Sequence, residues 1–169
     1  NIIGILFRSF IIISFCEELV KWLFTYVICW KDKNFNYVYD AIVYCVFISL
    51  GFASIENLIA ILSNSGGFTL ALQRGLITVP AHAFFGIISG YYLGLAKKYE
   101  ARRWNKRKRK YIILSLLIPI IVHGMFDSLL FLSSTASLLF ATALIVYLYL
   151  SSALKVVKTS SEAKKITRR

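Results

Sequence analysis

Residues 111–132 read YIILSLLIPIIVHGMFDSLLFL, and this stretch decides the fold class. Its length matches the roughly 20 apolar residues that an α-helix needs to cross the ~30 Å hydrocarbon core of a bilayer. Polar breaks separate it from similar apolar segments at residues 2–30, 40–62, 68–96 and 138–157. The sequence therefore predicts an all-α, polytopic membrane helix bundle with about five transmembrane helices.

The composition supports this class. Hydrophobic residues make up 58% of the 169 residues, against about 45–50% in soluble domains, which excludes an ordinary cytosolic domain. The 3 cysteines lie in apolar stretches without CxxC spacing, so neither a disulfide framework nor a zinc ribbon is indicated. We expect residues 1–157 to form a single transmembrane domain and residues 158–169 to form a basic cytoplasmic tail.

The charge distribution predicts the orientation. The chain has 20 Lys and Arg against 8 Asp and Glu, and most of the basic residues lie in residues 97–110 and 155–169. Two apolar segments separate these blocks, so both reach the same side, which the positive-inside rule makes cytoplasmic. We expect an integral membrane protein with a cytoplasmic C-terminus and anionic lipid at the basic loop. No nucleic-acid-binding motif accompanies the basic residues, so no nucleic acid partner is expected.

Charged and titratable residues interrupt the apolar segments. They are Glu17, Glu18, Lys21, Glu56, Arg74, His82, His123 and Asp127. An Asp, Lys or Arg facing lipid near the bilayer centre costs roughly 2.5–3.5 kcal/mol, so these side chains should face one another. Helical spacing allows Lys21 to pair with Glu17 or Glu18, and it places His123 beside Asp127.

The third apolar segment carries a stripe of small residues. His82, Gly86, Gly90 and Gly94 follow one another at four-residue spacing. Glycines at this spacing let a neighbouring helix backbone approach closely, which would hold His82 near a polar group of that helix. Pro80 predicts a kink or break in the segment.

Four motifs follow one another along successive apolar segments. They are EExxK at residues 17–21, FxxxEN at 52–57, HxxxG at 82–86 and HxxxD at 123–127. In this order they resemble the PrsW family of intramembrane proteases, distant relatives of the CAAX prenyl endopeptidases and the bacterial Abi (CPBP) proteins. The resemblance covers a protease core at residues 17–127. The CAAX enzymes carry EExxxR and FxxxH, whereas this chain has EExxK and has Thr78 four residues before His82, which argues against prenyl-protein processing.

The resemblance implies regulated intramembrane proteolysis in the bacterial plasma membrane, as part of a stress response. The substrate would be a single-span membrane protein, such as an anti-sigma factor, cut near its extracytoplasmic boundary. The resemblance also implies a glutamate-dependent reaction without a metal. The expected catalytic residues are Glu17, Glu18, Glu56, His82, His123 and Asp127, and the expected supporting residues are Lys21, Asn57 and Arg74.

Roles follow for some of these residues. The hypothesis is that Glu17, with His82, polarises a water that attacks a peptide carbonyl. By similarity to the CAAX enzymes, His123 with Asp127 or Asn57 would stabilise the oxyanion.

Other assignments stay open at the level of sequence. Either Glu17 or Glu18 could be the base, since adjacent carboxylates point about 100° apart on a helix. Glu56 is either a second acid/base group or a brace. Arg74 either extends to the outer face or pairs with an acid of the cavity.

The same carboxylates and imidazoles are good zinc ligands. The chain has no HExxH motif and no pair of histidines on one helical turn, so no cofactor is expected. Two other classes of function also use buried charges. One is a proton-coupled transporter, and the other is a non-catalytic immunity or scaffold protein.

Overall fold

The computed structural model describes residues 1–63, 67–161 and 166, and this part of the chain contains helices and no strand. The polar break between the apolar segments 40–62 and 68–96 falls mainly on residues 64–66, which lie outside the described residues, as does most of the expected basic tail. The elements are α1 (Ile2–Phe7), the π-helical η1 (Arg8–Phe15), α2 (Cys16–Cys29), α3 (Val38–Ser63), α4 (Gly67–Gln73), the π-helical η2 (Arg74–Thr78), α5 (Val79–Ala101), α6 (Asn105–Leu132) and α7 (Thr135–Ser161). The predicted all-α helix bundle is confirmed.

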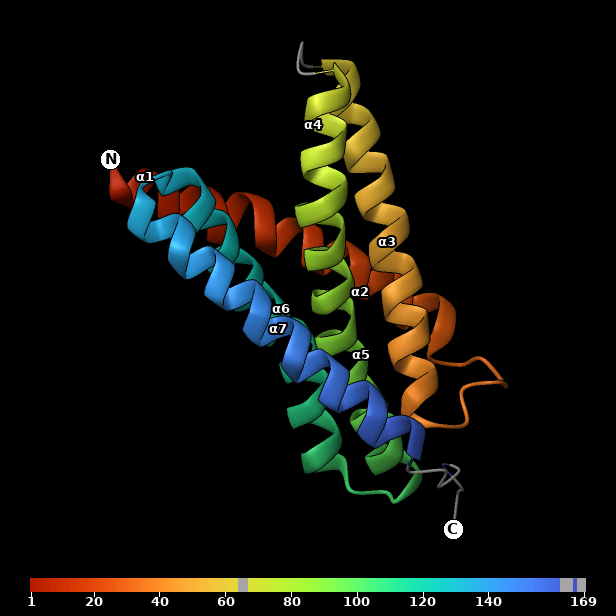
Figure 1. The fold of residues 1–169 in the computed structure, drawn as a ribbon. Coiled ribbons are helices and arrows are strands. Elements are labelled where there is room, and N and C mark those ends of the chain that lie inside the picture. The colour runs from red at the N-terminus through yellow and green to blue at the C-terminus, as the bar shows by residue number, and fades with distance from the viewer. Residues whose placement is uncertain (64–66, 162–165, 167–169) are drawn as a thin grey trace.

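Four helices of the described chain are long and apolar enough to cross a membrane: α3, the continuous run Gly67–Ala101, α6 and α7. The first apolar segment is also helical, but it is divided into α1, η1 and α2, and it is not among these four. About five such helices were predicted, so this segment accounts for the difference. Figure 1 shows it running across the direction of α3 and α5.

The connection between α5 and α6 is much shorter than predicted. The structure leaves only residues 102–104 outside the helices, where the sequence suggested a basic loop over residues 97–110. Lys and Arg are good helix formers, so both helices extend through the basic run. Glu100 also joins the two helices, because its carboxylate lies 3.2 Å from Lys97 Nζ and 2.5 Å from Lys108 Nζ.

The glycine stripe brings the backbones of α3 and α5 together. A Cβ atom on Gly90 would lie 2.5 Å from Ile42 Cα, and one on Gly94 would lie 2.6 Å from the carbonyl oxygen of Val38. Only glycine permits this separation, so the predicted close approach is confirmed. It also brings the site-bearing half of α3 next to His82 of α5, as expected.

Pro80 produces a local change of helix type and no break. The helix is continuous from Gly67 to Ala101, and Pro80 follows the π-helical residues Arg74–Thr78. A proline ring clashes with the carbonyl of the residue four positions earlier, here Leu76. The wider π-helical turn accommodates this clash within an unbroken helix.

A second proline in α6 ties three helices together. Pro119 has no N–H to donate to the carbonyl of Ser115. The hydroxyl of Ser89 in α5 donates to that carbonyl at 2.8 Å instead. The Ser115 hydroxyl in turn accepts a hydrogen bond from Trp22 Nε1 of α2 at 2.8 Å. A membrane span tolerates a proline when a neighbouring helix donates a hydrogen bond to the carbonyl that the proline leaves without a partner.

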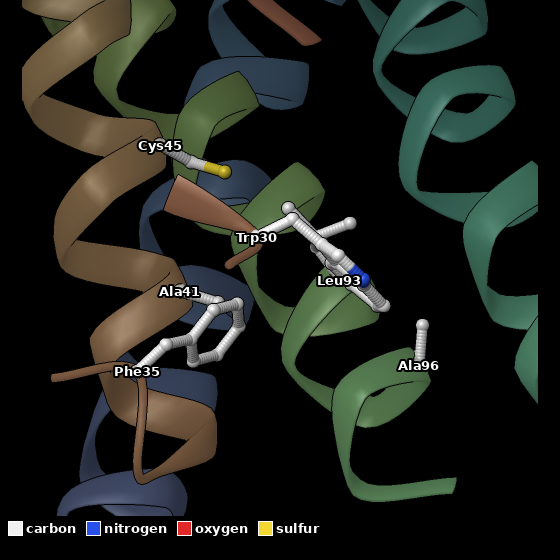
Figure 2. Packing of buried hydrophobic residues seen from close by; sticks show 6 residues of the cluster. All are labelled: Trp30, Phe35, Ala41, Cys45, Leu93 and Ala96. Atoms are coloured by element: carbon white, nitrogen blue, oxygen red, sulfur yellow. The ribbon is translucent and has the colours of Figure 1, made fainter. Parts of the chain in front are cut away.

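A hydrophobic cluster lies at the basic end of the bundle. Figure 2 shows its buried members on α3, α5 and the connection after α2: Trp30, Phe35, Ala41, Cys45, Leu93 and Ala96. Lys97 Nζ donates to the carbonyl of Trp30 at 2.6 Å and lies 4.7 Å from the centre of its ring. The lysine thereby caps the C-terminal end of α2, where a cation is favoured.

Candidate active site

A cavity of about 200 Å³ lies among η1, α2, α3, η2, α5 and α6. Its polar lining residues are Glu17, Glu56, Arg74, His82, His123 and Asp127. Its other lining residues are Ile13, Thr78, Phe126, Leu130 and Phe131. The structure thus brings to one cavity five of the six residues expected to be catalytic, and Glu18 is the exception.

The two adjacent glutamates have different surroundings. Glu18 is buried, with its Oε1 atom 2.5 Å from Lys21 Nζ and 2.9 Å from His123 Nδ1. Glu17 faces the cavity, and its Oε2 atom lies 3.6 Å from Lys21 Nζ. This oxygen is buried, and no described residue forms a hydrogen bond with it. Glu18 is therefore held at Oε1 by two partners and does not line the cavity, while Glu17 lines the cavity and keeps an oxygen available.

His82 connects α2 to α3. Its Nδ1 atom lies 2.9 Å from Lys21 Nζ, and its Nε2 atom lies 3.2 Å from Glu56 Oε2. An ammonium group only donates hydrogen bonds, so Nδ1 acts as the acceptor. The proton of the neutral imidazole then sits on Nε2, facing the carboxylate of Glu56.

His123 lies between two carboxylates. Its Nδ1 atom contacts Glu18, and its Nε2 atom lies 3.4 Å from Asp127 Oδ2. The ring stacks on Phe85 with 4.7 Å between centres, and its centre is 5.3 Å from that of His82. A carboxylate only accepts hydrogen bonds, so both ring nitrogens of His123 face acceptors.

Arg74 takes the second of its two expected positions and pairs with an acid of the cavity. Its guanidinium donates to Glu56 Oε1 at 2.5 Å and to Asn57 Oδ1 at 2.8 Å. The amide oxygen of Asn57 is thus engaged by Arg74, and Asn57 is not among the residues that line the cavity. Asn57 thus contacts Arg74 outside the cavity lining, and its role in a reaction stays a prediction.

These contacts form one chain of polar groups around Glu17. The chain runs through Arg74, Glu56, His82, Lys21, Glu18, His123 and Asp127. Networks of this kind are rigid when each member has its partners, because an unpaired polar group in a low dielectric is costly. The chain therefore fixes both histidines relative to the carboxylate of Glu17.

The sequence reasoning missed several contributors from η1 and α6. Arg8 stands in an apolar segment, like the charged residues that were singled out, and its guanidinium lies 4.8 Å from the ring centre of Phe131. The ring of Phe10 packs on Gly124, where a Cβ atom would lie 2.5 Å from the phenylalanine Cδ1. Arg8 could have been found by its charge. Phe10 and Phe131 could not, because apolar side chains in a membrane helix carry no signal that separates lipid from cavity.

The donor atoms allow a test of whether the site suits a metal ion. Glu17, His82 and His123 each offer one ligand atom, and these atoms lie within 4.8 Å of one another. Three such ligands is the number found in many catalytic zinc sites. However, the lone pair of His82 points to the Lys21 ammonium and its other nitrogen carries the proton. The hydrogen bonding of His82 does not fit a role as a metal ligand.

Fold and site together define a class: a polytopic membrane protein whose helices bury a cluster of carboxylates, imidazoles and cations beside an internal cavity. Residues 1–154 match a family described as "PrsW family intramembrane metalloprotease". The chain belongs to the PrsW family and is an integral membrane protein. The family predicted from the four motifs is confirmed.

Curated relatives agree with this assignment. The chain is 42% identical over 76% of its length to Protease PrsW of Halalkalibacterium halodurans, and 33% identical over 96% of its length to Protease PrsW of Clostridioides difficile. It is 37% identical over 75% of its length to Protease PrsW of Bacillus subtilis. The matches span 57%, 68% and 56% of these relatives, so the chain covers little more than half the length of two of them. No solved structure gives a significant match.

Proposed function

We propose that this chain is an intramembrane endopeptidase that uses Glu17 as the general base. Its substrate class would be single-span membrane proteins, such as an anti-sigma factor. The observation that carries the proposal is the contrast between the two glutamates. Glu18 pairs through Oε1 with Lys21 and His123 and does not line the cavity. Glu17 lines the cavity, and its buried Oε2 atom has no hydrogen-bond partner among the described residues.

The reaction begins with a water in the cavity. Glu17 accepts a proton from this water, and the water oxygen attacks the carbonyl carbon of the scissile peptide bond. The proton on Glu17 then passes to the leaving nitrogen as the C–N bond breaks. A positioned general base typically contributes 10²–10⁴-fold to the rate. A base in this role must reach the water, and Glu17 lines the cavity whereas Glu18 does not.

The histidines stabilise the negative charge that develops on the carbonyl oxygen. Both line the cavity beside Glu17, and their nitrogens that face Glu56 and Asp127 lie at 3.2 and 3.4 Å from those carboxylates. These contacts are longer than the 2.9 Å contacts at Nδ1 of each ring. The rings therefore keep their place through Nδ1, while either Nε2–H can exchange its longer contact for a substrate oxyanion. Removing one well-placed oxyanion donor costs roughly 2.7–4 kcal/mol in other hydrolases.

Glu56 acts as a brace in this scheme. Its Oε1 atom is held by Arg74, and its Oε2 atom faces His82 Nε2. The carboxylate thereby keeps the histidine proton on the nitrogen that lines the cavity. No metal ion is part of the proposed reaction, and no step requires one.

The position of the cavity along the helices supports a cut near the extracytoplasmic boundary. Glu56 and Asp127 lie toward the ends of α3 and α6 at Ser63 and Leu132. The basic residues that join α5 to α6 lie at the opposite end of the bundle. The positive-inside rule assigns that end to the cytoplasm, where it would also contact anionic lipid. The cavity then lies in the outer half of the membrane.

The test is co-expression with a panel of tagged single-span membrane proteins, with new termini mapped by mass spectrometry. The variants are Glu17→Gln and Glu18→Gln, with Glu100→Gln at the basic end as the matched control. We expect a cut near the outer end of the substrate span that is lost in Glu17→Gln. Glu18→Gln should lower the yield of folded protein, and Glu100→Gln should cleave as the wild type does.

Other results would contradict the proposal. Cleavage that persists in folded Glu17→Gln would remove this residue as the base. A cut at the cytoplasmic end of the span would overturn the assignment of the outer half. Failure of the wild type to cut any panel member, together with ion or solute flux in liposomes that Glu17→Gln abolishes, would favour a transporter.

A further inference from the structure

The cavity is lined in part by apolar side chains that take no part in the proposed chemistry. They are Ile13 from η1 and Phe126, Leu130 and Phe131 from α6, and we call them the apolar wall. We propose that it is a subsite for one apolar side chain of the substrate, next to the scissile bond. This inference rests on the proposed function, and it adds the class of residue at which the chain cuts.

The spacing on α6 places this wall directly beside the reacting groups. Phe126 and Leu130 are one helical turn apart, and so are Asp127 and Phe131. Residues four apart on a helix are neighbours on its surface. A substrate side chain that contacts Leu130 would therefore bring its own peptide group to the level of His123 and Asp127.

The size of the cavity suits one residue of a peptide. Its volume of about 200 Å³ is smaller than the roughly 300–1,000 Å³ of pockets that enclose a drug-sized molecule. Phe126 forms a fixed floor, since it is 1% exposed and its ring contacts that of Phe85 with 6.3 Å between centres. Phe131 is 40% exposed and forms the rim.

The rim is held by a cation outside the polar chain around Glu17. The guanidinium of Arg8 lies 4.8 Å from the ring centre of Phe131, a cation–π contact between η1 and α6. This contact holds the phenylalanine ring at the exposed end of the apolar lining.

The chemistry of the wall selects against polar side chains. A polar group placed there would give up its hydration without gaining a hydrogen bond from Ile13, Phe126 or Leu130. A leucine or phenylalanine side chain would bury apolar surface and gain from its size. The prediction is a preference for large apolar residues, set by the volume that Leu130 leaves free.

The experiment measures kcat/KM in proteoliposomes for single-span peptides that differ in the residue next to the mapped cut. The chain is compared as wild type, Leu130→Trp and Leu130→Ala. The matched control is Leu132→Trp, because Leu132 is on the same helix, 41% exposed and not part of the cavity lining. Leu130→Trp should lower the preference for Leu over Ala by about tenfold. Leu130→Ala should extend cleavage to larger residues, and Leu132→Trp should leave the preference unchanged.

A second measurement separates the subsite from the chemistry. Phe131 is replaced by p-benzoylphenylalanine in a Glu17→Gln background, and cross-links to the peptides are mapped. Cross-links at the residue next to the cut support the subsite. Cross-links only to lipid, or an unchanged preference in both Leu130 variants, would overturn it. If the wild type cuts no peptide, the proposed function fails first, and the cross-links show separately whether a peptide side chain occupies the wall.

Discussion

The two ends of the bundle use the same pair of residue types in different surroundings. At the cavity, Lys21 lies 2.5 Å from Glu18, and their side chains are 4% and 3% exposed. At the basic end, Lys108 lies 2.5 Å from Glu100, and their side chains are 25% and 30% exposed. The two ion pairs are equally short, so the distance between charges does not distinguish them. Their access to water does.

This difference decides what each pair contributes. An exposed pair stabilises a fold by about 0–1 kcal/mol, because water solvates either charge when the other is removed. A buried pair adds little over an apolar replacement of both partners, but the loss of one partner leaves a charge without compensation. The buried pair also positions both histidines, since Lys21 contacts His82 and Glu18 contacts His123. At the cavity, a change in this ion pair should therefore affect both the positions of the histidines and the stability of the fold. At the basic end it should not.

The largest effect is expected for Lys21→Met. The variant leaves Glu18 buried without its cation, and loss of one partner of a buried pair costs about 3–5 kcal/mol. The free energy of unfolding in detergent should fall by this amount, and peptide cleavage should be lost. The measurement is denaturation followed by tryptophan fluorescence, in parallel with a cleavage assay.

Lys108→Met is the control for that variant. It removes the same charge from an equally short ion pair, and it should change the free energy of unfolding by less than about 1 kcal/mol. Equal losses of unfolding free energy in Lys21→Met and Lys108→Met would show that burial does not determine what each ion pair contributes.

The close contact between α3 and α5 at Gly90 should be nearly as sensitive to substitution. Gly90→Ala places a Cβ atom 2.5 Å from Ile42 Cα, so α3 and α5 must move apart. Overpacking of this kind costs typically 1–3 kcal/mol, and it would also separate Glu56 from His82. The check is the unfolding transition together with the cleavage rate. Gly51→Ala is the matched control, since no atom lies within 4 Å of its Cβ position. It should be neutral or stabilising, because alanine is the better helix former.

Much of this arrangement could be predicted from the sequence, because the membrane restricts where charged side chains and close helix contacts can lie. Charges such as Glu56 and Asp127 cannot face lipid, so their convergence follows from their presence in apolar segments. The stripe from Gly86 to Gly94 indicated the contact with another helix in the same way. The roles of the site residues in a reaction stay predictions.

The rest could not be predicted, because it depends on tertiary contacts without a local signal. Nothing in the sequence separates Glu17 from Glu18, and only the position of α6 decides which one meets His123. The apolar wall of the cavity resembles any lipid-facing stretch. Ser89 reaches the carbonyl freed by Pro119 from another helix. The prediction of a loop over residues 97–110 was wrong, because a run of basic residues indicates the membrane boundary and not the end of a helix.

A smaller effect is expected at the ion pair of Arg74 and Glu56, whose side chains are 21% and 32% exposed. Arg74→Gln removes the charged donor to Glu56, and hydrogen bonds to charged groups contribute about 1.5–3 kcal/mol. We expect kcat/KM to fall about 10–100-fold. The change in stability should be small, because Glu56 is 32% exposed and water can replace the guanidinium as its hydrogen-bond donor. Arg102→Gln at the basic end should leave kcat/KM unchanged. A large loss of stability in Arg74→Gln would mean that the Arg74–Glu56 pair behaves like the buried Lys21–Glu18 pair.

The smallest effect is expected from Lys97→Met, and it tests the basic end directly. The ammonium of Lys97 donates to the Trp30 carbonyl, lies above the aromatic ring and is 3.2 Å from Glu100. Several weak contacts at a partly exposed site sum to about 1 kcal/mol, since water replaces each of them. Salt screens the interaction between exposed charges that are farther apart than the Debye length, which falls from about 10 Å at 0.1 M to about 3 Å at 1 M. The stability difference between wild type and Lys97→Met should therefore shrink between these salt concentrations, while the difference for Lys21→Met should persist. A salt-independent loss in Lys97→Met would indicate that the lysine acts through its packing on Trp30 and not through its charge.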